Sequence, residues 1–219
     1  MEFAPPPHPI RLLLIRHGEV EATYHRVFGG SRIDMGLSPL GHAQAQALTR
    51  WLAPDAISRV YASPMQRVAQ TMAPLLAAKQ LQPILLPDLR EVDFGDWTGL
   101  NWDEVKQRFG VSAYDWLEVL DQGALPGGES AAQLAARVSP CLQRILAENP
   151  HQPVAIVCHG GIIRVILSLL LQIPLSRTAH FHIEYGSLSI VEVDPEKRHS
   201  VELDLLNFQP LLADRQPVP

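Results

Sequence analysis

Arg16, His17 and Gly18 combine, in one short segment, a fixed cation, a nucleophile or base, and a backbone that other groups can approach closely. They follow directly after Ile10-Arg11-Leu12-Leu13-Leu14-Ile15, an apolar run that is typical of a buried strand in an α/β sheet. Open α/β sheets bind their ligands just beyond the carboxyl ends of their strands. We therefore expect these residues to lie at a ligand site.

The second half of the chain repeats this arrangement. Val154-Ala155-Ile156-Val157-Cys158 predicts another buried strand, which ends in His159-Gly160-Gly161 and leads into an apolar helix that begins near Ile162. The glycines allow a sharp turn, and the backbone N–H groups at the start of the helix favour an anion. This strand end therefore indicates a ligand with negative charge.

A third segment, Tyr61-Ala62-Ser63-Pro64-Met65-Gln66-Arg67, predicts a strand end followed by a helix. Ser63 is the expected N-cap, and Pro64 occupies the first helical position, where a missing N–H has no cost. Arg67 then lies in the first helical turn. Like Arg16, it would present a planar fork of donors, which suits phosphate better than the point charge of a lysine.

Carboxylates gather in a fourth segment, Leu89 to Trp97, after the strand-like residues 83–86. Its acidic residues are Glu91, Asp93 and Asp96. Each could act as a general acid or base, and carboxylate chemistry alone does not separate them.

Taken in order, these four segments resemble the histidine phosphatase superfamily, the phosphoglycerate-mutase-like enzymes. The match consists of the Arg-His-Gly-Glu strand end, the Ser-Pro-x-x-Arg-x-x-x-Thr helix start, the Glu-x-x-Phe-Gly-x-Trp turn and the strand ending in His-Gly-Gly. Leu37-Ser38-Pro39-Leu40-Gly41-His42-Ala43-Gln44-Ala45 is similar to the first-helix signature of the family. The resemblance covers nearly the whole chain, and no single segment would carry it alone.

The resemblance implies a role for each candidate residue. His17 would attack phosphorus through one neutral ring nitrogen, while a backbone carbonyl holds the other nitrogen. Two nearby guanidinium groups would favour the neutral ring by opposing an extra positive charge. Glu91 would protonate the departing alkoxide and then activate water, as a general acid and base. The residues expected to hold the phosphate are Arg16, Arg67, His159 and Gly160.

The chain departs from the family just after the nucleophile. Many members have an asparagine there that helps to hold the phosphate, whereas Glu21-Ala22-Thr23-Tyr24-His25 offers Thr23 at about the matching place. We expect the Thr23 hydroxyl, or else His25, to take over this contact. Glu19 is interpreted either as a partner of an arginine or as an ordinary surface acid.

The interval between Glu91 and the second histidine resembles the compact phosphatases more than the mutases, which carry a longer insert. Leu89 to Trp97 with Trp102, Pro126 to Ser130, and His180 to Gly186 resemble α-ribazole-5′-phosphate phosphatases of cobalamin synthesis, and broad-specificity phosphatases share most of these features. The expected function is hydrolysis of a small phosphorylated metabolite through a phosphohistidine. The alternatives are a cofactor-dependent phosphoglycerate mutase and, in another class, a non-catalytic phospholigand-binding protein.

The implied mechanism needs no metal and no cofactor, because arginine and histidine would carry the phosphate charge. The chain has no His-x-x-x-His or Cys-x-x-Cys pair, so ligand spacing gives no support for a metal site. His180 and His182 would share one face of a strand, and we interpret them as satisfied or exposed strand residues.

Composition agrees with a cytoplasmic enzyme of one domain. The 219 residues suffice for one substantial α/β core, and the net charge of −5 gives no basic excess that would indicate nucleic acid or an anionic membrane surface. Cys141 and Cys158 are interpreted as small core residues rather than a disulfide framework. The oligomeric state is left open.

Alternating strand and helix patterns predict a three-layer α/β/α sandwich with a mostly parallel central sheet. Strands are expected near 10–16, 57–62, 83–87 and 154–158, and helices near 39–53, 64–79, 129–148 and 161–171. An antiparallel hairpin is expected at 180–193 and 199–206, joined by residues 194–197. The domain would span 10–208, between a loose leader at 1–9 and a loose tail at 209–219. It would contain an irregular insert at 93–128, which the family resemblance implies roofs the active site.

Overall fold

A six-stranded sheet with the order β3-β2-β4-β1-β5-β6 forms the centre of the computed structural model, which describes residues 9–149, 151–194 and 200–213. β1 pairs in parallel with β4, β4 with β2, and β2 with β3, whereas β5 runs antiparallel to its neighbours β1 and β6. The strands are β1 (Ile10–Arg16), β2 (Arg59–Ala62), β3 (Pro83–Leu85), β4 (Val154–Cys158), β5 (Leu188–Asp194) and β6 (Ser200–Phe208). The predicted mostly parallel sheet with a late antiparallel pair is confirmed.

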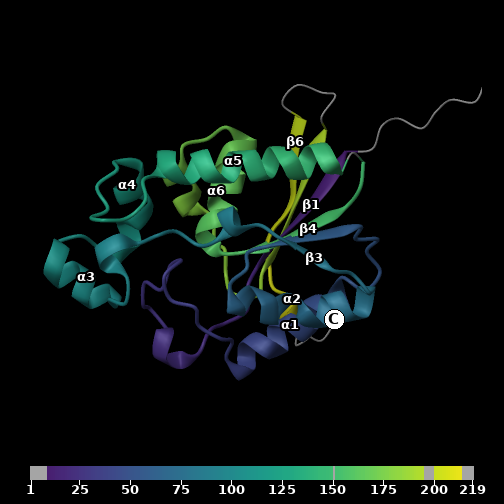
Figure 1. The fold of residues 1–219 in the computed structure, drawn as a ribbon, viewed down its shortest axis with the longest axis horizontal. Coiled ribbons are helices and arrows are strands. Elements are labelled where there is room, and N and C mark those ends of the chain that lie inside the picture. The colour runs from purple at the N-terminus through teal and green to yellow at the C-terminus, as the bar shows by residue number, and fades with distance from the viewer. Residues whose placement is uncertain (1–8, 150, 195–199, 214–219) are drawn as a thin grey trace, which may run out of the picture.

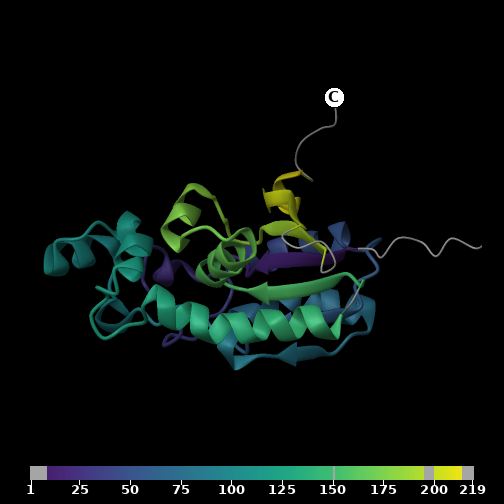
Figure 2. The same cartoon turned by 90° about the horizontal axis from the view of Figure 1, so that it is seen from above.

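Helices cover both faces of the sheet, as Figures 1 and 2 show. Successive residues of β1 point to opposite faces: Leu13 and Ile15 pack in the core with α1 and α2, whereas Leu12 and Leu14 pack with α5 and α6. This two-sided burial explains why the strand is apolar along its length rather than at alternate positions. The helices are α1 (Pro39–Trp51), α2 (Gln66–Lys79), α5 (Ala131–Glu148) and α6 (Gly160–Leu171).

The roof segment, residues 93–128, is not irregular as the sequence suggested, because it contains the helices α3 (Trp102–Phe109) and α4 (Trp116–Asp121). Asn101 and Glu104 form a complete capping box at the start of α3, and Gly110 ends it in the left-handed region at φ 71°. These signals are present in the sequence, in a segment whose Trp, Asp and Gly content favoured a loop. The 3-10 turns are η1 (Ala22–Tyr24), η2 (Pro87–Leu89), η3 (Gly95–Trp97), η4 (Ala113–Asp115) and η5 (Leu175–His180).

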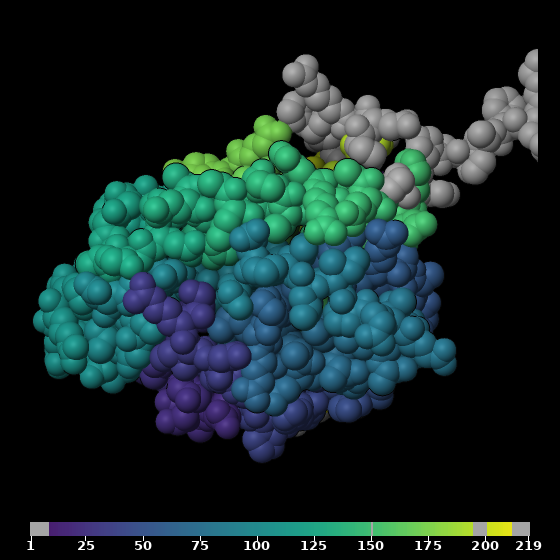
Figure 3. Space-filling model, viewed as in Figure 1, coloured from purple at the N-terminus to yellow at the C-terminus, as the bar shows by residue number. Residues whose placement is uncertain are grey.

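The roof segment packs against the loop of residues 20–37 at one end of the molecule, where Figure 3 shows the two in contact. Phe28 N donates to the Leu100 carbonyl over 3.0 Å, and Gly99 N donates to the Phe28 carbonyl over 2.9 Å. An isolated bridge joins Val27 to Asn101. The loop of residues 20–37 and the roof segment therefore pack together as one unit.

Residues 180–187 do not form the first part of the hairpin, since β5 begins only at Leu188. They complete η5 and then form a loop, which is held against the strand end: Gly186 N donates to the His17 carbonyl and Arg16 N to the Ser187 carbonyl. His180 and His182 consequently do not share a strand face. Residues 195–197 of the predicted turn lie outside the described residues.

Both chain ends were expected to be loose. The tail contains a short helix, α7 (Pro210–Ala213), while residues 214–219 and 1–8 lie outside the described part of the chain. Cys141 and Cys158 are free and buried, as predicted. Among the described residues, no helix is long and apolar enough to cross a membrane.

Candidate active site

The carboxyl ends of three parallel neighbours, β1, β2 and β4, bring the predicted site together. Arg16 lies opposite Cys158 in the β1–β4 register, and His17 N donates to the Cys158 carbonyl over 3.0 Å. Ser63, after β2, donates from its N–H to the Val157 carbonyl over 3.1 Å. A pocket of about 380 Å³ opens at this edge. Of the predicted site residues it is lined by Arg16, His17, Arg67, Glu91 and Gly160.

His17 is 4% exposed, and its two partners fix the ring tautomer. Nδ1 lies 2.8 Å from the Gly18 carbonyl oxygen, which only accepts, so Nδ1 carries the proton. Arg67 Nε donates to Nε2 over 3.2 Å, and a guanidinium only donates, so Nε2 keeps its lone pair.

The pKa of His17 lies well below its ordinary value of 6.5. Burial is the largest cause, followed by the charges of Arg67 and Arg16, and the hydrogen bond to Gly18 opposes them. The sequence pointed to the two guanidinium groups, whereas burial contributes more. The ring is therefore neutral near pH 7, with an unprotonated Nε2 whose electron pair accepts from Arg67 Nε.

Arg67 lies in the first turn of α2 and is 2% exposed. Besides His17, its guanidinium binds two backbone carbonyls, those of Ile33 at 3.2 Å and Gly30 at 3.0 Å. Thr71, one turn later, accepts from Gly18 N over 2.9 Å and donates to the Arg67 carbonyl over 2.7 Å. The threonine of the motif thus joins α2 to the turn that carries the histidine.

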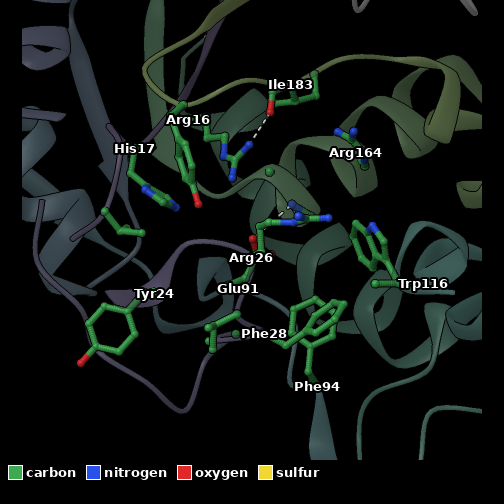
Figure 4. Close-up of a pocket in the computed structure, with 18 of the residues that line it drawn as sticks. Arg16, His17, Tyr24, Arg26, Phe28, Glu91, Phe94, Trp116, Arg164 and Ile183 are labelled. Carbon is green, nitrogen blue, oxygen red and sulfur yellow. Dashed lines mark hydrogen bonds between the residues drawn. The ribbon is translucent and has the colours of Figure 1, made fainter. Parts of the chain in front are cut away.

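Arg16 is held by residues of the loop before β5. Its Nη1 donates to the Ile183 carbonyl, drawn as a dashed line in Figure 4, and its guanidinium carbon lies 3.9 Å from the centre of the Tyr185 ring. A Cβ at Gly160 would come within 3.3 Å of Arg16 Nε. The absence of a side chain at Gly160 therefore leaves room for the guanidinium.

His159 is fully buried beside His17, with ring centroids 5.2 Å apart in an edge-to-face arrangement. Its Nε2 lies 2.8 Å from Ser63 Oγ, and its Nδ1 is buried without a hydrogen-bond partner among the described residues. Burial, then the charge of Arg67, holds the pKa of His159 well below 6.5.

Ser63 does not cap α2 as predicted. Met65 occupies the N-cap position, and the helix begins at Gln66, two residues after Pro64. The Ser63 hydroxyl is directed to His159 instead, because that buried ring requires a polar partner. Tertiary contacts thus override the local capping preference at this position.

Glu91 lines the pocket and accepts two backbone N–H groups. Its Oε1 accepts from Val92 N over 3.0 Å and its Oε2 from Gly161 N over 3.2 Å, at the start of α6. A Cβ at Gly161 would overlap Glu91 Oε1 and crowd Val92. The second glycine after His159 is thus required for the carboxylate to reach this place.

Neither alternative carboxylate lines the pocket. Asp93 pairs with Arg32 at 2.7 Å and accepts from Gly95 N over 2.9 Å, and Asp96 is exposed. Of the three acids that the sequence left open, Glu91 is the one that the structure brings beside His17 and Arg67.

Arg137 on α5 holds the segment that carries Glu91, a role that the sequence gave no reason to expect. It forms a two-pronged pair with Glu129, with Nε to Oε1 at 2.7 Å and Nη2 to Oε2 at 2.9 Å. The same guanidinium donates to the backbone carbonyls of Asp88, Arg90 and Glu91. Arg137 thus positions the backbone of the acid without lining the pocket.

The structure does not bring Thr23 to the pocket. Thr23 and His25 are both exposed, and neither lines the cavity. His25 Nε2 lies 3.0 Å from the Val20 carbonyl oxygen, so its ring is turned back to its own loop. Tyr24 and Arg26 line the cavity instead.

Glu19 has neither of its two expected roles as an arginine partner or a plain surface acid. Its carboxylate accepts a hydrogen bond from Ser38 Oγ, the N-cap of α1, and lies 3.7 Å from His25 Nε2. Glu19 therefore ties the turn after His17 to the start of α1.

The tryptophans of the roof divide between the two interpretations, core packing and substrate contact. Trp97 is 1% exposed and packs edge-to-face against Phe28. Trp102 and Trp116 line the pocket, and Figure 4 shows Trp116 on its wall together with Phe94. Arg164 on α6 also lines it, and was not among the predicted site residues. In the sequence it was one arginine within an apolar helix.

The comparisons with known proteins agree with this geometry. A family model described as "Histidine phosphatase superfamily (branch 1)" matches residues 12–205. The chain therefore belongs to the histidine phosphatase superfamily.

Two similar proteins and one similar solved structure show the extent of the match. Phosphoserine phosphatase 1 of Hydrogenobacter thermophilus is 30% identical over 196 residues, which cover 90% of this chain and 92% of that protein. The bifunctional protein of Mycobacterium tuberculosis is 34% identical over 197 residues, 89% of this chain, and the chain spans about half of that relative's length (53%). Among solved structures, the alpha-ribazole phosphatase of Shigella flexneri superposes with a TM-score of 0.79 at 27% identity, covering 91% of this chain and 97% of that one.

Proposed function

We propose that this chain is a phosphomonoesterase that hydrolyses a small phosphorylated metabolite through a phosphohistidine at His17. The observation that carries the proposal is the state of His17: a neutral ring whose Nδ1 proton is held by Gly18 and whose Nε2 electron pair lies beside Arg67, at the pocket. Buried neutral histidine with a fixed tautomer is a competent nucleophile.

In the first step, Arg16 and Arg67 hold the phosphoryl oxygens and His159 donates to one of them. Nε2 of His17 forms a bond to phosphorus while the bond from phosphorus to the ester oxygen breaks, and Glu91 gives its proton to the departing oxygen. In the second step, Glu91 takes a proton from water, the hydroxide oxygen bonds to phosphorus, and the phosphorus–Nε2 bond breaks. Orthophosphate leaves and His17 is neutral again.

The names of the relatives suggest which esters to test first. Alpha-ribazole 5′-phosphate and phosphoserine follow from the names of similar proteins, and broad specificity is the third option. The site chemistry described above serves all of them, since it engages the phosphoryl group.

The test is release of phosphate in the presence of EDTA from alpha-ribazole 5′-phosphate, phosphoserine, 3-phosphoglycerate and an aryl phosphate. Wild type should turn over at least one ester, His17→Ala should release none, and an acid-labile phosphoryl group should be trapped on the wild-type protein by rapid quenching. Release by His17→Ala at a near-normal rate would refute the mechanism. Conversion of 3-phosphoglycerate to 2-phosphoglycerate in place of phosphate release, dependent on a bisphosphate primer, would indicate a mutase.

A further inference from the structure

The pocket holds more positive charge than the phosphoryl group requires. Four arginines line it, against two glutamates, although the chain as a whole has a net charge of −5. Arg16 and Arg67 flank His17, where the transferred phosphate would bind. The remaining two, Arg26 and Arg164, come from the loop of residues 20–37 and from α6, and the proposed phosphoryl transfer gives neither side chain a role.

Arg164 lies one turn into α6, after the glycines that follow His159. Nη2 donates to the Phe181 carbonyl over 2.8 Å, which fixes the guanidinium, while Nε is buried without a hydrogen-bond partner among the described residues. A buried donor left without a partner is costly, and a ligand atom is one way to satisfy it. In the view of Figure 4, Arg164 lies beyond Arg16 as seen from His17.

The electrostatic surroundings of Arg164 also favour an anion. Burial and the charge of Arg16 lower the pKa of Arg164 to about 10, while Glu91 and Glu184 act in the opposite direction. Arg164 is still protonated at pH 7, in a place where its charge is poorly solvated and repelled by a neighbour. A ligand with a second negative charge would relieve both costs.

Arg26 lines the same pocket, from the loop of residues 20–37. Its guanidinium carbon lies 4.8 Å from the centre of the Trp102 ring, and its carbonyl accepts from Trp102 N over 3.2 Å. Its backbone adopts φ 59°, which is uncommon for a residue other than glycine and is found at functional sites. Arg26 is exposed, so its guanidinium can turn from the Trp102 ring toward a ligand.

We propose that Arg164, assisted by Arg26, binds a second anionic group on the leaving portion of the substrate, a carboxylate or a second phosphate. This inference rests on the proposed function, because it assigns the transferred phosphate to Arg16 and Arg67. Guanidinium forks bind carboxylate and phosphate through paired hydrogen bonds, so either group fits the same residues. Esters with one phosphate and no other charge would bind less well.

The experiment uses esters that differ in the second anion. Phosphoserine is compared with phosphoethanolamine, which lacks its carboxylate, and fructose 1,6-bisphosphate is compared with fructose 6-phosphate. In at least one of the two pairs, wild-type kcat/KM should be at least about 10-fold higher for the ester with the second anionic group than for the ester without it. This factor is expected for a charge-assisted hydrogen bond. The pair that shows the preference identifies the second anion as carboxylate or phosphate.

Arg164→Gln should bring that kcat/KM ratio close to one, mainly through KM of the doubly anionic ester. Arg26→Gln should lower the same ratio, and it stays informative if Arg164→Gln is poorly folded, since Arg26 is exposed. Arg108→Gln is the matched control: this exposed arginine of α3 pairs with Glu104 on the surface and should leave the ratio unchanged.

The outcomes separate the two proposals. A ratio near one for both pairs in wild type, or a ratio that both variants leave intact, overturns the second-anion site while the phosphatase proposal stands. If no ester is hydrolysed, the phosphatase proposal fails, and calorimetry then decides the site: a doubly anionic ester should bind wild type about 10-fold more tightly than its partner. Equal affinities, or no binding, overturn the site.

Discussion

Replacing Arg137 by lysine tests whether Arg137, which does not line the pocket, positions the Glu91 carboxylate. Lysine keeps the positive charge but lacks the fork that holds both oxygens of Glu129 and three backbone carbonyls of the Glu91 segment. The Arg137 side chain is only 20% exposed, so these bonds are not fully replaced by water. We expect unfolding to become easier by about 2–3 kcal/mol, since each charge-assisted bond contributes on the order of 1.5–3 kcal/mol and lysine retains part of them.

The catalytic effect should be larger than the effect on binding. Displacement of a reacting group by about 1 Å costs on the order of 100-fold in rate, so kcat should fall about 10- to 100-fold. KM should change by less than about threefold, because Arg137 does not line the pocket. The assay is steady-state phosphate release at a temperature well below the unfolding midpoint of the variant.

A double-mutant cycle distinguishes positioning from a general loss of structure. In a Glu91→Gln background the acid is already absent, so Arg137→Lys should lower kcat little further. Arg144→Lys is the control on the same helix: its ion pair with Glu148 is exposed, and the change should leave kcat unaltered. An equal fall in kcat in both backgrounds would refute the positioning role.

Two further predictions follow from close packing and from the buried histidines. Gly161→Ala should lower kcat at least about 10-fold, because its Cβ would displace the Glu91 carboxylate, whereas Gly36→Ala, whose Cβ would stay 3.5 Å from the nearest atom, should be tolerated. Since His17 and His159 have folded-state pKa values well below 6.5, the unfolded chain binds more protons as pH falls through 6.5. The free energy of unfolding should therefore be highest above that pH and should fall below it, by about 1.4 kcal/mol per pH unit for each histidine. Urea unfolding at pH 7.5 and 5.5 measures the decline, and equal stability at both values would contradict it.

The fold and the centre of the site could be predicted from the sequence because both depend on local patterns. A strand buried on both faces is apolar along its length, so β1 and β4 are evident, and the residues after each of them meet at one edge of the sheet. The helix expected from residue 39 likewise begins there, with Ser38 as its N-cap.

The residues that the sequence did not reveal act through contacts between distant segments. Arg137 and Arg144 lie on the same helix, and they differ in the folded chain because Arg137 is half-buried against Glu129 and the carbonyls of residues 88–91, whereas Arg144 pairs on the surface. Arg26 rather than Thr23 lines the pocket, in a loop whose positive φ at Arg26 no local sequence pattern predicts. Arg164 similarly differs from a surface arginine only by its surroundings in the folded chain.

The glycines show why a motif can be recognised without revealing specificity. A Cβ at Gly18 would lie 2.6 Å from the Gly41 carbonyl oxygen, and one at Gly161 would overlap Glu91. Each of these glycines is required in this chain because another part of the chain occupies the space, so packing fixes the glycines of the motif. Arg26 and Arg164 line the pocket instead, so the proposed leaving-group site can change while the packing around the proposed phosphoryl-transfer centre stays the same.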